Sequence, residues 1–203
     1  MPTIDEVYIE GSYAGGRMLP GTYTVELNVD GSIHSAALVI KADPRIDADA
    51  AAYAAQDDLL KKLEADVTDI HMAVTRMRKL ASQVRTLNGI LESDEAKAEL
   101  VKSGKSLLDK IKVWEEKLIQ PKSQSYDDVI NFVNKLSANI IFVHGEVNGT
   151  VPYVTAGQKA RYTELHQQWL VLKTEMDNLL STDIAAFNAL CRKFDVSNIL
   201  LPE

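Results

Sequence analysis

The chain has 203 residues, of which 46% are hydrophobic and 25% are charged, as is typical of an ordinary globular protein of one or two domains. Its formal net charge of -7 argues against a nucleic-acid partner, because phosphate binding requires clustered Lys and Arg side chains. The same charge disfavours an anionic membrane surface. No apolar stretch approaches the roughly 18 residues of a membrane span, so we expect no membrane insertion.

Two features bear on the cellular compartment. The first residues, MPTIDEVYIEG, have neither the basic region nor the apolar core of a signal peptide. We therefore expect either a cytoplasmic protein or a stretch that begins inside a longer parent. The single cysteine, Cys191, allows no intrachain disulfide and no thiolate cluster, and its apolar surroundings predict a small buried side chain.

A β-hairpin is predicted near the N-terminus. Residues 22–29 alternate between polar and apolar side chains, which is the period of a half-buried strand. Asp30-Gly31 accepts the positive φ angles of a tight turn, and residues 33–41 supply the return strand. Residues 4–9 (IDEVYI) are predicted to form a third strand. Three strands bury too little apolar area to fold alone, so another element must cover this sheet.

The pattern changes to a helical period of 3.5 residues after Asp43-Pro44-Arg45, where Arg45 is expected to pair with an acid on a helix. The first helix is predicted to bury Leu60, Leu63, Val67, Ile70, Val74, Met77, Ala81, Val84, Asn88 and Leu91. The second is predicted to bury Leu100, Gly104, Leu107, Ile111, Trp114 and Leu118.

Two more helices follow the same rule. The third is predicted to bury Val129, Val133, Leu136, Ile140, Val143 and Val147. The fourth, capped by a Thr155-x-x-Gln158 box, is predicted to bury Tyr162, Leu165, Trp169, Leu172, Met176, Leu179, Asp183, Ala186, Leu190 and Phe194. Four stripes joined by short loops predict a mainly α protein, an antiparallel four-helix bundle with a small N-terminal antiparallel β-sheet. We divide the chain into residues 1–45 and 46–203.

No catalytic, cofactor or metal site is predicted. The histidines His34, His71, His144 and His166 lack metal-ligand spacing, and His71 and His166 are expected on flanking helix surfaces. The adjacent acid pairs 57–58, 115–116 and 127–128 are typical of solvated helix faces. Asn88 and Asp183 are polar residues on apolar stripes, where such residues fix helix register. The aromatic residues expected in the core are Trp114, Trp169, Tyr162, Phe132 and Phe187.

A family resemblance accompanies these patterns. The segments LPGTYTVELNVDG and ALVIKADPR resemble the C-terminal region of large secreted bacterial sialidase-like or sortilin-like β-propeller proteins, often called glycosyl hydrolases. The segment from Val151 to Ile199 is similar to that family's final helix, and the matching positions are Pro152, Thr155, Asp183, Asn188 and Ile199. The resemblance covers nearly all of residues 17–203. It implies that the hairpin is part of an Ig-like sandwich, and it carries no activity because the propeller is absent.

Three functions follow as hypotheses. The first is a non-catalytic structural or protein-interaction module, the C-terminal accessory part of a larger extracytoplasmic (periplasmic or secreted) propeller protein. The second is an independent helical protein that oligomerises through helix seams or by strand addition. The third, a glycoside hydrolase, follows from family naming alone. The expected partner is a protein, either the parent propeller domain or another subunit, and no cofactor is expected.

Overall fold

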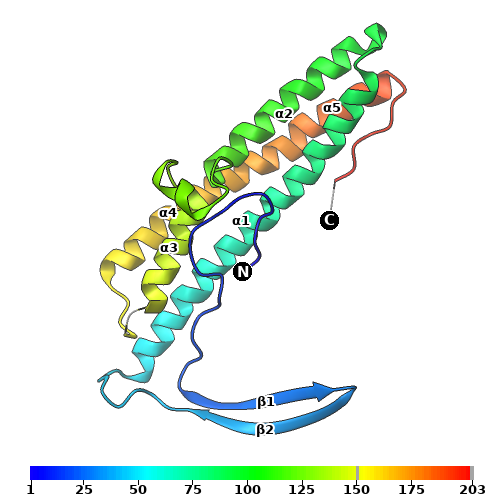
Figure 1. Ribbon diagram of the computed structural model, residues 1–203. Helices are drawn as coiled ribbons and strands as arrows, with labels where there is room; N and C mark the ends of the chain where they lie inside the picture. The colour runs from blue at the N-terminus through cyan, green and yellow to red at the C-terminus, as the bar shows by residue number, and fades with distance from the viewer. Residues whose placement is uncertain (150, 202–203) are drawn as a thin grey trace.

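The computed structural model describes residues 1–149 and 151–201 and is mainly helical, with one two-stranded antiparallel sheet (Figure 1). In chain order the elements are β1 (Gly21–Val29), β2 (Ser32–Ile40), α1 (Ala50–Leu91), η1 (Glu95–Lys97), α2 (Ala98–Leu118), η2 (Tyr126–Ile130), α3 (Leu136–Gly149), α4 (Ala156–Asn178), η3 (Leu179–Ile184) and α5 (Ala185–Lys193). The short elements η1 and η2 are 3-10 helices, whereas η3 is π-helical and joins α4 to α5 without a break.

The hairpin forms where the sequence predicts it. Asp30 and Gly31 have φ angles of 50° and 87°, and the Asn28 side chain accepts a hydrogen bond from the Gly31 amide at 3.0 Å. These angles match the twist of the flanking strands, which pair from Val29↔Ser32 to Gly21↔Ile40. Arg45, in contrast, pairs with Asp43 at 2.7 Å, so the expected contact with a helical acid is wrong.

The first two apolar stripes are confirmed in full. Every predicted position of α1 and α2 is buried, including Asn88 and Gly104. These two residues lie against each other, because a methyl group at Gly104 would overlap the Asn88 amide. The alternating steps of three and four residues therefore identified the packed face of each helix.

The third stripe is confirmed only from Leu136 onward. Val129 lies in η2, and Val133 is 78% exposed in the turn that precedes α3. The end of α2 explains the difference, since Leu118 and Ile119 already fill the core there. An α3 extended backward to residue 129 would compete with them for the same surface of α1.

The predicted positions of the fourth stripe are buried from Leu165 to Leu179, and Tyr162 is partly buried. After Leu179 the fully buried positions of the helix are Ile184, Phe187 and Cys191. Of the predicted positions there, Leu190 and Phe194 are partly buried against the core, whereas Ala186 is exposed. The π-helical segment η3 inserts one residue into the helical phase, so every later core position moves by one. Asp183 instead forms an ion pair with Lys110 of α2.

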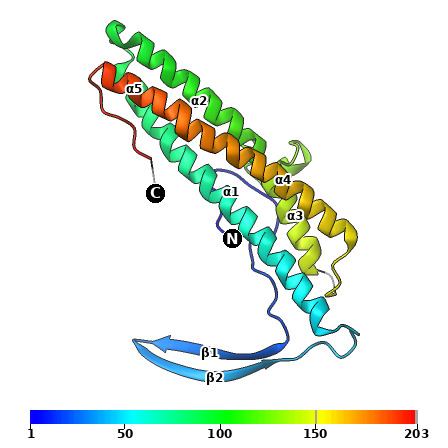
Figure 2. The same ribbon diagram turned by 180° about the vertical axis from the view of Figure 1, so that it is seen from behind.

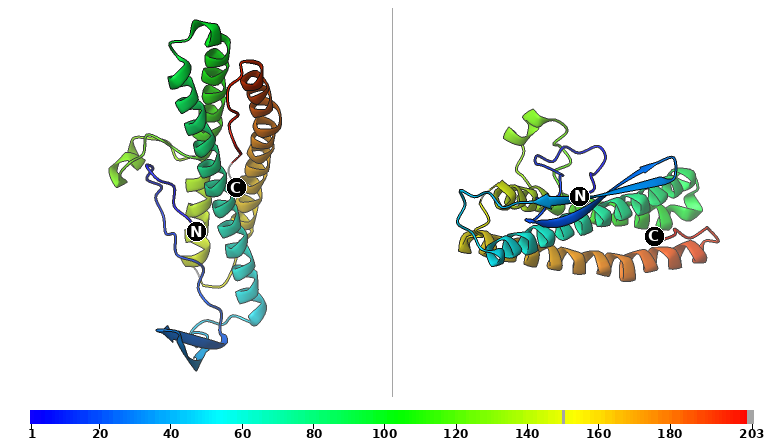
Figure 3. Two further views of the ribbon diagram at one scale, coloured as in Figure 1. Left: turned by 90° about the vertical axis from the view of Figure 1, so that its right-hand side faces the viewer. Right: turned by 90° about the horizontal axis from the view of Figure 1, so that it is seen from below.

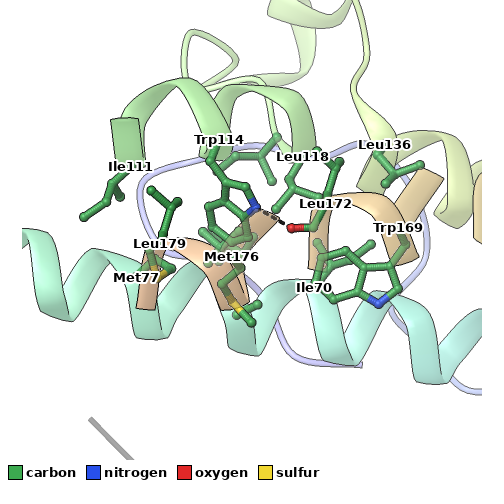
Figure 4. Close-up of a cluster of buried hydrophobic side chains, with 14 of the residues drawn as sticks. Ile70, Met77, Ile111, Trp114, Leu118, Leu136, Trp169, Leu172, Met176 and Leu179 are labelled. Atoms are coloured by element: carbon green, nitrogen blue, oxygen red, sulfur yellow. Dashed lines mark hydrogen bonds between the residues drawn. The ribbon is translucent and has the colours of Figure 1, made fainter. Parts of the chain in front are cut away.

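The helices pack lengthwise around a continuous apolar core. α2 lies along the C-terminal part of α1, α3 lies along its N-terminal part, and α4 with η3 and α5 returns beside them (Figures 1 and 2). Trp114 joins α2 to α4, because its indole N–H donates to the Leu172 carbonyl at 2.8 Å within a cluster of Leu, Ile and Met side chains (Figure 4). Of the other aromatic residues expected in the core, Trp169 and Phe187 are buried, whereas Tyr162 and Phe132 are only partly buried.

The N-terminal segment, residues 1–18, packs on the helices instead of forming the predicted third strand. Ile4 and Ile9 are buried in the helical core, and the Tyr8 amide donates to the Ser123 carbonyl at 2.8 Å. Gly11 has a φ of 139° and lies so close to Ile141 that a Cβ would overlap that side chain. The prediction for residues 4–9 was wrong because their apolar side chains contact helices rather than a neighbouring strand.

Candidate interaction surface

The cross-strand register sorts the hairpin side chains onto two faces. Tyr23, Val25, Leu27 and Val29 share one face with Leu38, which opposes Tyr23 on β2, and with Ile40, which opposes Gly21. We call these six residues the apolar face. Successive residues of a strand point to opposite sides, so Thr22, Thr24, Glu26 and Asn28 lie on the other face, together with Ile33 and Val39.

The apolar face is uncovered. Val25, Leu27, Val29 and Leu38 are 45 to 60% exposed, and Tyr23 and Ile40 are the only partly buried residues of the two strands. The hairpin projects from one end of the helical part (Figure 3). A contiguous row of exposed aliphatic side chains is uncommon on a monomeric surface and marks an interaction site.

The base of the hairpin adds a hollow to this surface. A cavity of about 260 Å³ lies among residues from the hairpin, the start of α1 and the loop before α4, including Met18, Ile40, Tyr53 and Val151. Met18 and Val151 remain exposed beside it. The Tyr153 hydroxyl donates to the Asp47 carbonyl, which holds the loop before α4 against the segment before α1. No periodic pattern marks Met18 or Val151, so the sequence did not single them out.

A second hollow, of about 440 Å³, lies between α2, α4 and η3. Val113, Trp114 and Leu179 contribute its apolar lining. Two ion pairs cross it, Lys110 with Asp183 and Lys117 with Glu175 at 2.7 Å. Both lysines that line it are therefore paired with acids across it.

The histidines do not converge. His34 is exposed on β2, and His166 bonds Asp66 at 2.8 Å. His71 is buried, contrary to its expected place on a helix surface: its Nδ1 donates to the Pro2 carbonyl at 2.7 Å, and its Nε2 accepts from the Ser137 hydroxyl at 2.5 Å. Burial lowers the pKa of His71 because it removes the water that would solvate the imidazolium.

His144 has a structural position close to the end of α3. Its Nε2 contacts a Glu64 oxygen at 3.1 Å, and the same oxygen accepts from the Gly16 amide at 2.6 Å. His71 therefore binds the start of the N-terminal segment, whereas His144 contacts the Glu64 carboxylate that binds the segment near its end. In the described part of the chain, no group of three or more His, Cys, Asp or Glu side chains could hold a metal ion.

Several acids of the helices have local partners, and the thiol is deeply buried. Asp66 is mostly buried, and this burial raises the pKa of its carboxyl group although His166 opposes the shift. Asp57 pairs with Lys61 and Glu115 pairs with Arg78. Cys191 is fully buried as predicted, and burial raises the pKa of its thiol.

The positions that carried the family resemblance have structural roles at the C-terminal end. The Asn188 amide donates to the Ile199 carbonyl at 3.1 Å and accepts from the Ile199 amide at 2.9 Å, while the Ile199 side chain is buried. Thr155 and Gln158 form the predicted capping box. The capping box begins α4, and the contacts between Asn188 and Ile199 fasten the last described residues to α5.

Comparison of the chain with protein-family models, curated proteins and solved structures gives no match. Among the residues that the structure describes, no helix has the length and apolar character needed to cross a bilayer.

Proposed function

We propose that this chain is a non-catalytic structural or protein-interaction module that docks a protein partner on its hairpin. The exposed apolar face carries this proposal, because four aliphatic side chains of one small sheet lie open to water while the helical core is filled. In the proposed arrangement the helices form an antiparallel bundle in which α2 and α3 share one position beside α1, so that the bundle is the support and the hairpin is the contact element.

The wider context is a proposal supported by the family resemblance alone. We place the module as a C-terminal accessory part of a larger extracytoplasmic propeller protein, in which the hairpin joins an Ig-like sandwich. The glycoside hydrolase hypothesis rests on the same resemblance. Release of dye from chromogenic glycosides by the purified chain, abolished by changing particular acids, would replace the present proposal.

Oligomerisation through the helix seams has less support than docking on the hairpin. The seam residues of α1 and α2 are buried within one chain, and so is the stripe of α4 up to Leu179 apart from the partly buried Tyr162. A second chain would have to displace this packing to reach them. The hairpin, in contrast, presents its apolar residues without rearrangement.

Thiol labelling tests whether the docking face is open. We expect Leu27→Cys to react with a maleimide in the folded protein at nearly the rate of a free thiol, whereas Val67→Cys, at a fully buried α1 position, should react only on unfolding. The native Cys191 is fully buried and gives a low background. Protection of Leu27→Cys in a dilute, monomeric sample would show that the hairpin folds back on its own helices, and would refute the proposal.

A further inference from the structure

We propose that the occupant of the apolar face is a second copy of this chain, with two hairpins stacked face to face about a two-fold axis. This inference rests on the proposed function, because it names the partner of the same surface. A two-fold contact uses one patch twice, so the patch must be complementary to itself.

The side-chain chemistry of the apolar face meets that requirement. On this side of the hairpin, β1 contributes Gly21, Tyr23, Val25, Leu27 and Val29, and the opposing β2 residues are, in the same order, Ile40, Leu38, Ala36, His34 and Ser32. It holds no carboxylate, Lys or Arg, so two copies can meet without burying a like-charge pair. Glu26, the one charged residue within the strands, lies on the opposite face.

The position of the hairpin limits repulsion between two acidic chains. Each chain has a net charge of -7, which opposes association in general. The nine-residue strands extend about 30 Å at about 3.3 Å per residue. The proposed contact is made by the hairpin and its base, at one end of each chain (Figure 1), and salt screens the charges outside it over about 8 Å at physiological ionic strength.

Stacking with the hairpins antiparallel also uses the base of the hairpin. The turn end of one copy then reaches the base of the other. Val29, next to the turn, would lie against Met18 and Val151 of the second copy, and all three side chains are about half exposed or more. The base hollow beside Ile40 would receive the turn end of the second copy.

The area of the contact predicts a reversible dimer. Two strands about 4.8 Å apart and about 30 Å long present a face of roughly 300 Å². Even with the base included, the total buried by two copies remains at or below the low end of stable interfaces, about 1,200 Å². We therefore expect a monomer–dimer equilibrium that depends on protein concentration.

Sedimentation velocity over a wide concentration range tests the proposal, with variants of the full chain. Wild type should shift from monomer to dimer as its concentration rises. Leu27→Ser/Leu38→Ser should raise the dissociation constant at least about a hundredfold, because the two-fold axis repeats each lost leucine. The matched control Ile33→Ser/Val39→Ser removes two equally exposed aliphatic side chains from the other face and should leave the equilibrium unchanged.

Three outcomes would overturn the inference. If the wild type stays monomeric at every concentration while Leu27→Cys reacts freely, the apolar face is open but does not bind a second copy. The dimer is then refuted, whereas the proposed docking function stands. Weakening by the control pair equal to that by Leu27→Ser/Leu38→Ser would show that the contact is not made by the apolar face in particular. A dimer abolished by Ser35→Pro, whose amide lies on the outer edge of β2, but kept in Leu27→Ser/Leu38→Ser would indicate edge pairing instead.

Discussion

The contact between Asn88 of α1 and Gly104 of α2 explains why a glycine occupies position 104. Neither polar atom of the Asn88 side chain has a hydrogen-bond partner, and the amide packs directly on Gly104. A glycine inside a helix costs about 1 kcal/mol relative to alanine, so close approach of α1 and α2 is the physical reason for its presence. The step pattern located both residues, whereas their contact required the structure.

We expect Gly104→Ala to lower the free energy of unfolding by about 1 to 3 kcal/mol, because the new methyl group overpacks against Asn88. Gly145→Ala is the matched control, since this α3 glycine has open space around it and should gain about 0.5 to 1 kcal/mol from helix propensity. Urea denaturation measures both changes. Adding Asn88→Ala to Gly104→Ala should recover most of the loss, and strict additivity of the two changes would contradict the contact.

His71 makes stability depend on pH. Its folded pKa lies below its unfolded value near 6.5, so the unfolded chain binds the proton first as the pH falls. The stabilisation from neutral, buried His71 is therefore present above about pH 6.5 and declines as the solution becomes more acidic, by at most about 1.4 kcal/mol per pH unit.

His71→Gln tests this dependence, because a glutamine amide can donate to the Pro2 carbonyl and accept from Ser137 without titrating. Denaturation between neutral and mildly acidic pH should show a shallower loss of stability than in wild type. His34→Gln, an exposed position on β2, is the control and should follow wild type. An unchanged slope in His71→Gln would assign the pH dependence to other groups.

Among the elements, the continuous helix from α4 through η3 to α5 changes phase in its interior. Core positions run from Met176 to Leu179 and then jump five residues to Ile184 before the ordinary steps resume at Phe187. Lys110 and Asp183 pair beside this jump. The π-helical turn thus lets both ends of one long helix face the same core.

We expect deletion of Thr182, an exposed residue of η3, to be tolerated, because the jump from Leu179 shortens to four residues and an ordinary α-helical turn then continues. Deletion of Gln167, an exposed residue of regular α4, should instead rotate one part of the helix by about 100° and turn core side chains outward. Circular dichroism with thermal unfolding distinguishes the two. Equal loss of cooperative unfolding would show that η3 is required for the packing.

The sequence predicted elements best where one period continued without interruption. The stripes of α1 and α2 are regular from end to end, and all their predicted core residues are buried. The start of α3 and the second half of the last helix could not be predicted this way. Val133 fits the period but is exposed, and the core there is occupied by the end of α2. The π-helical segment η3 changes the helical phase, and no Gly or Pro in its sequence indicates the change.

At the scale of the whole molecule, the hairpin shares little packing with the helical core, whereas the N-terminal segment is part of that core. The strands bury little of their own surface, but Ile4 and Ile9 lie among the helices. Alternation in residues 22–29 predicted that another element would bury one face of the strand. In the structure the helices leave that face exposed. Alternation could not predict this, because a period of two identifies the apolar face but not the element that packs on it.

Replacing residues 21–40 with a short Gly-Ser linker should therefore change the free energy of unfolding of the helices by no more than about 0.5 kcal/mol. Removing residues 1–10 should lower it by about 3 kcal/mol or more, since two buried isoleucines are lost. Thermal and urea unfolding followed at the helical signal compare the two. A large loss on hairpin replacement would reveal support that the exposed strands do not indicate.

The uninterrupted length of α1 has a mechanical consequence. With 42 residues it spans about 60 Å from the hairpin end to its turn into α2, and the returning helices brace it along the way. A partner bound to the hairpin would therefore be separated by about the length of α1 from a partner bound near the turn into α2. The helical part would act as a rigid spacer that sets the distance between the two bound partners.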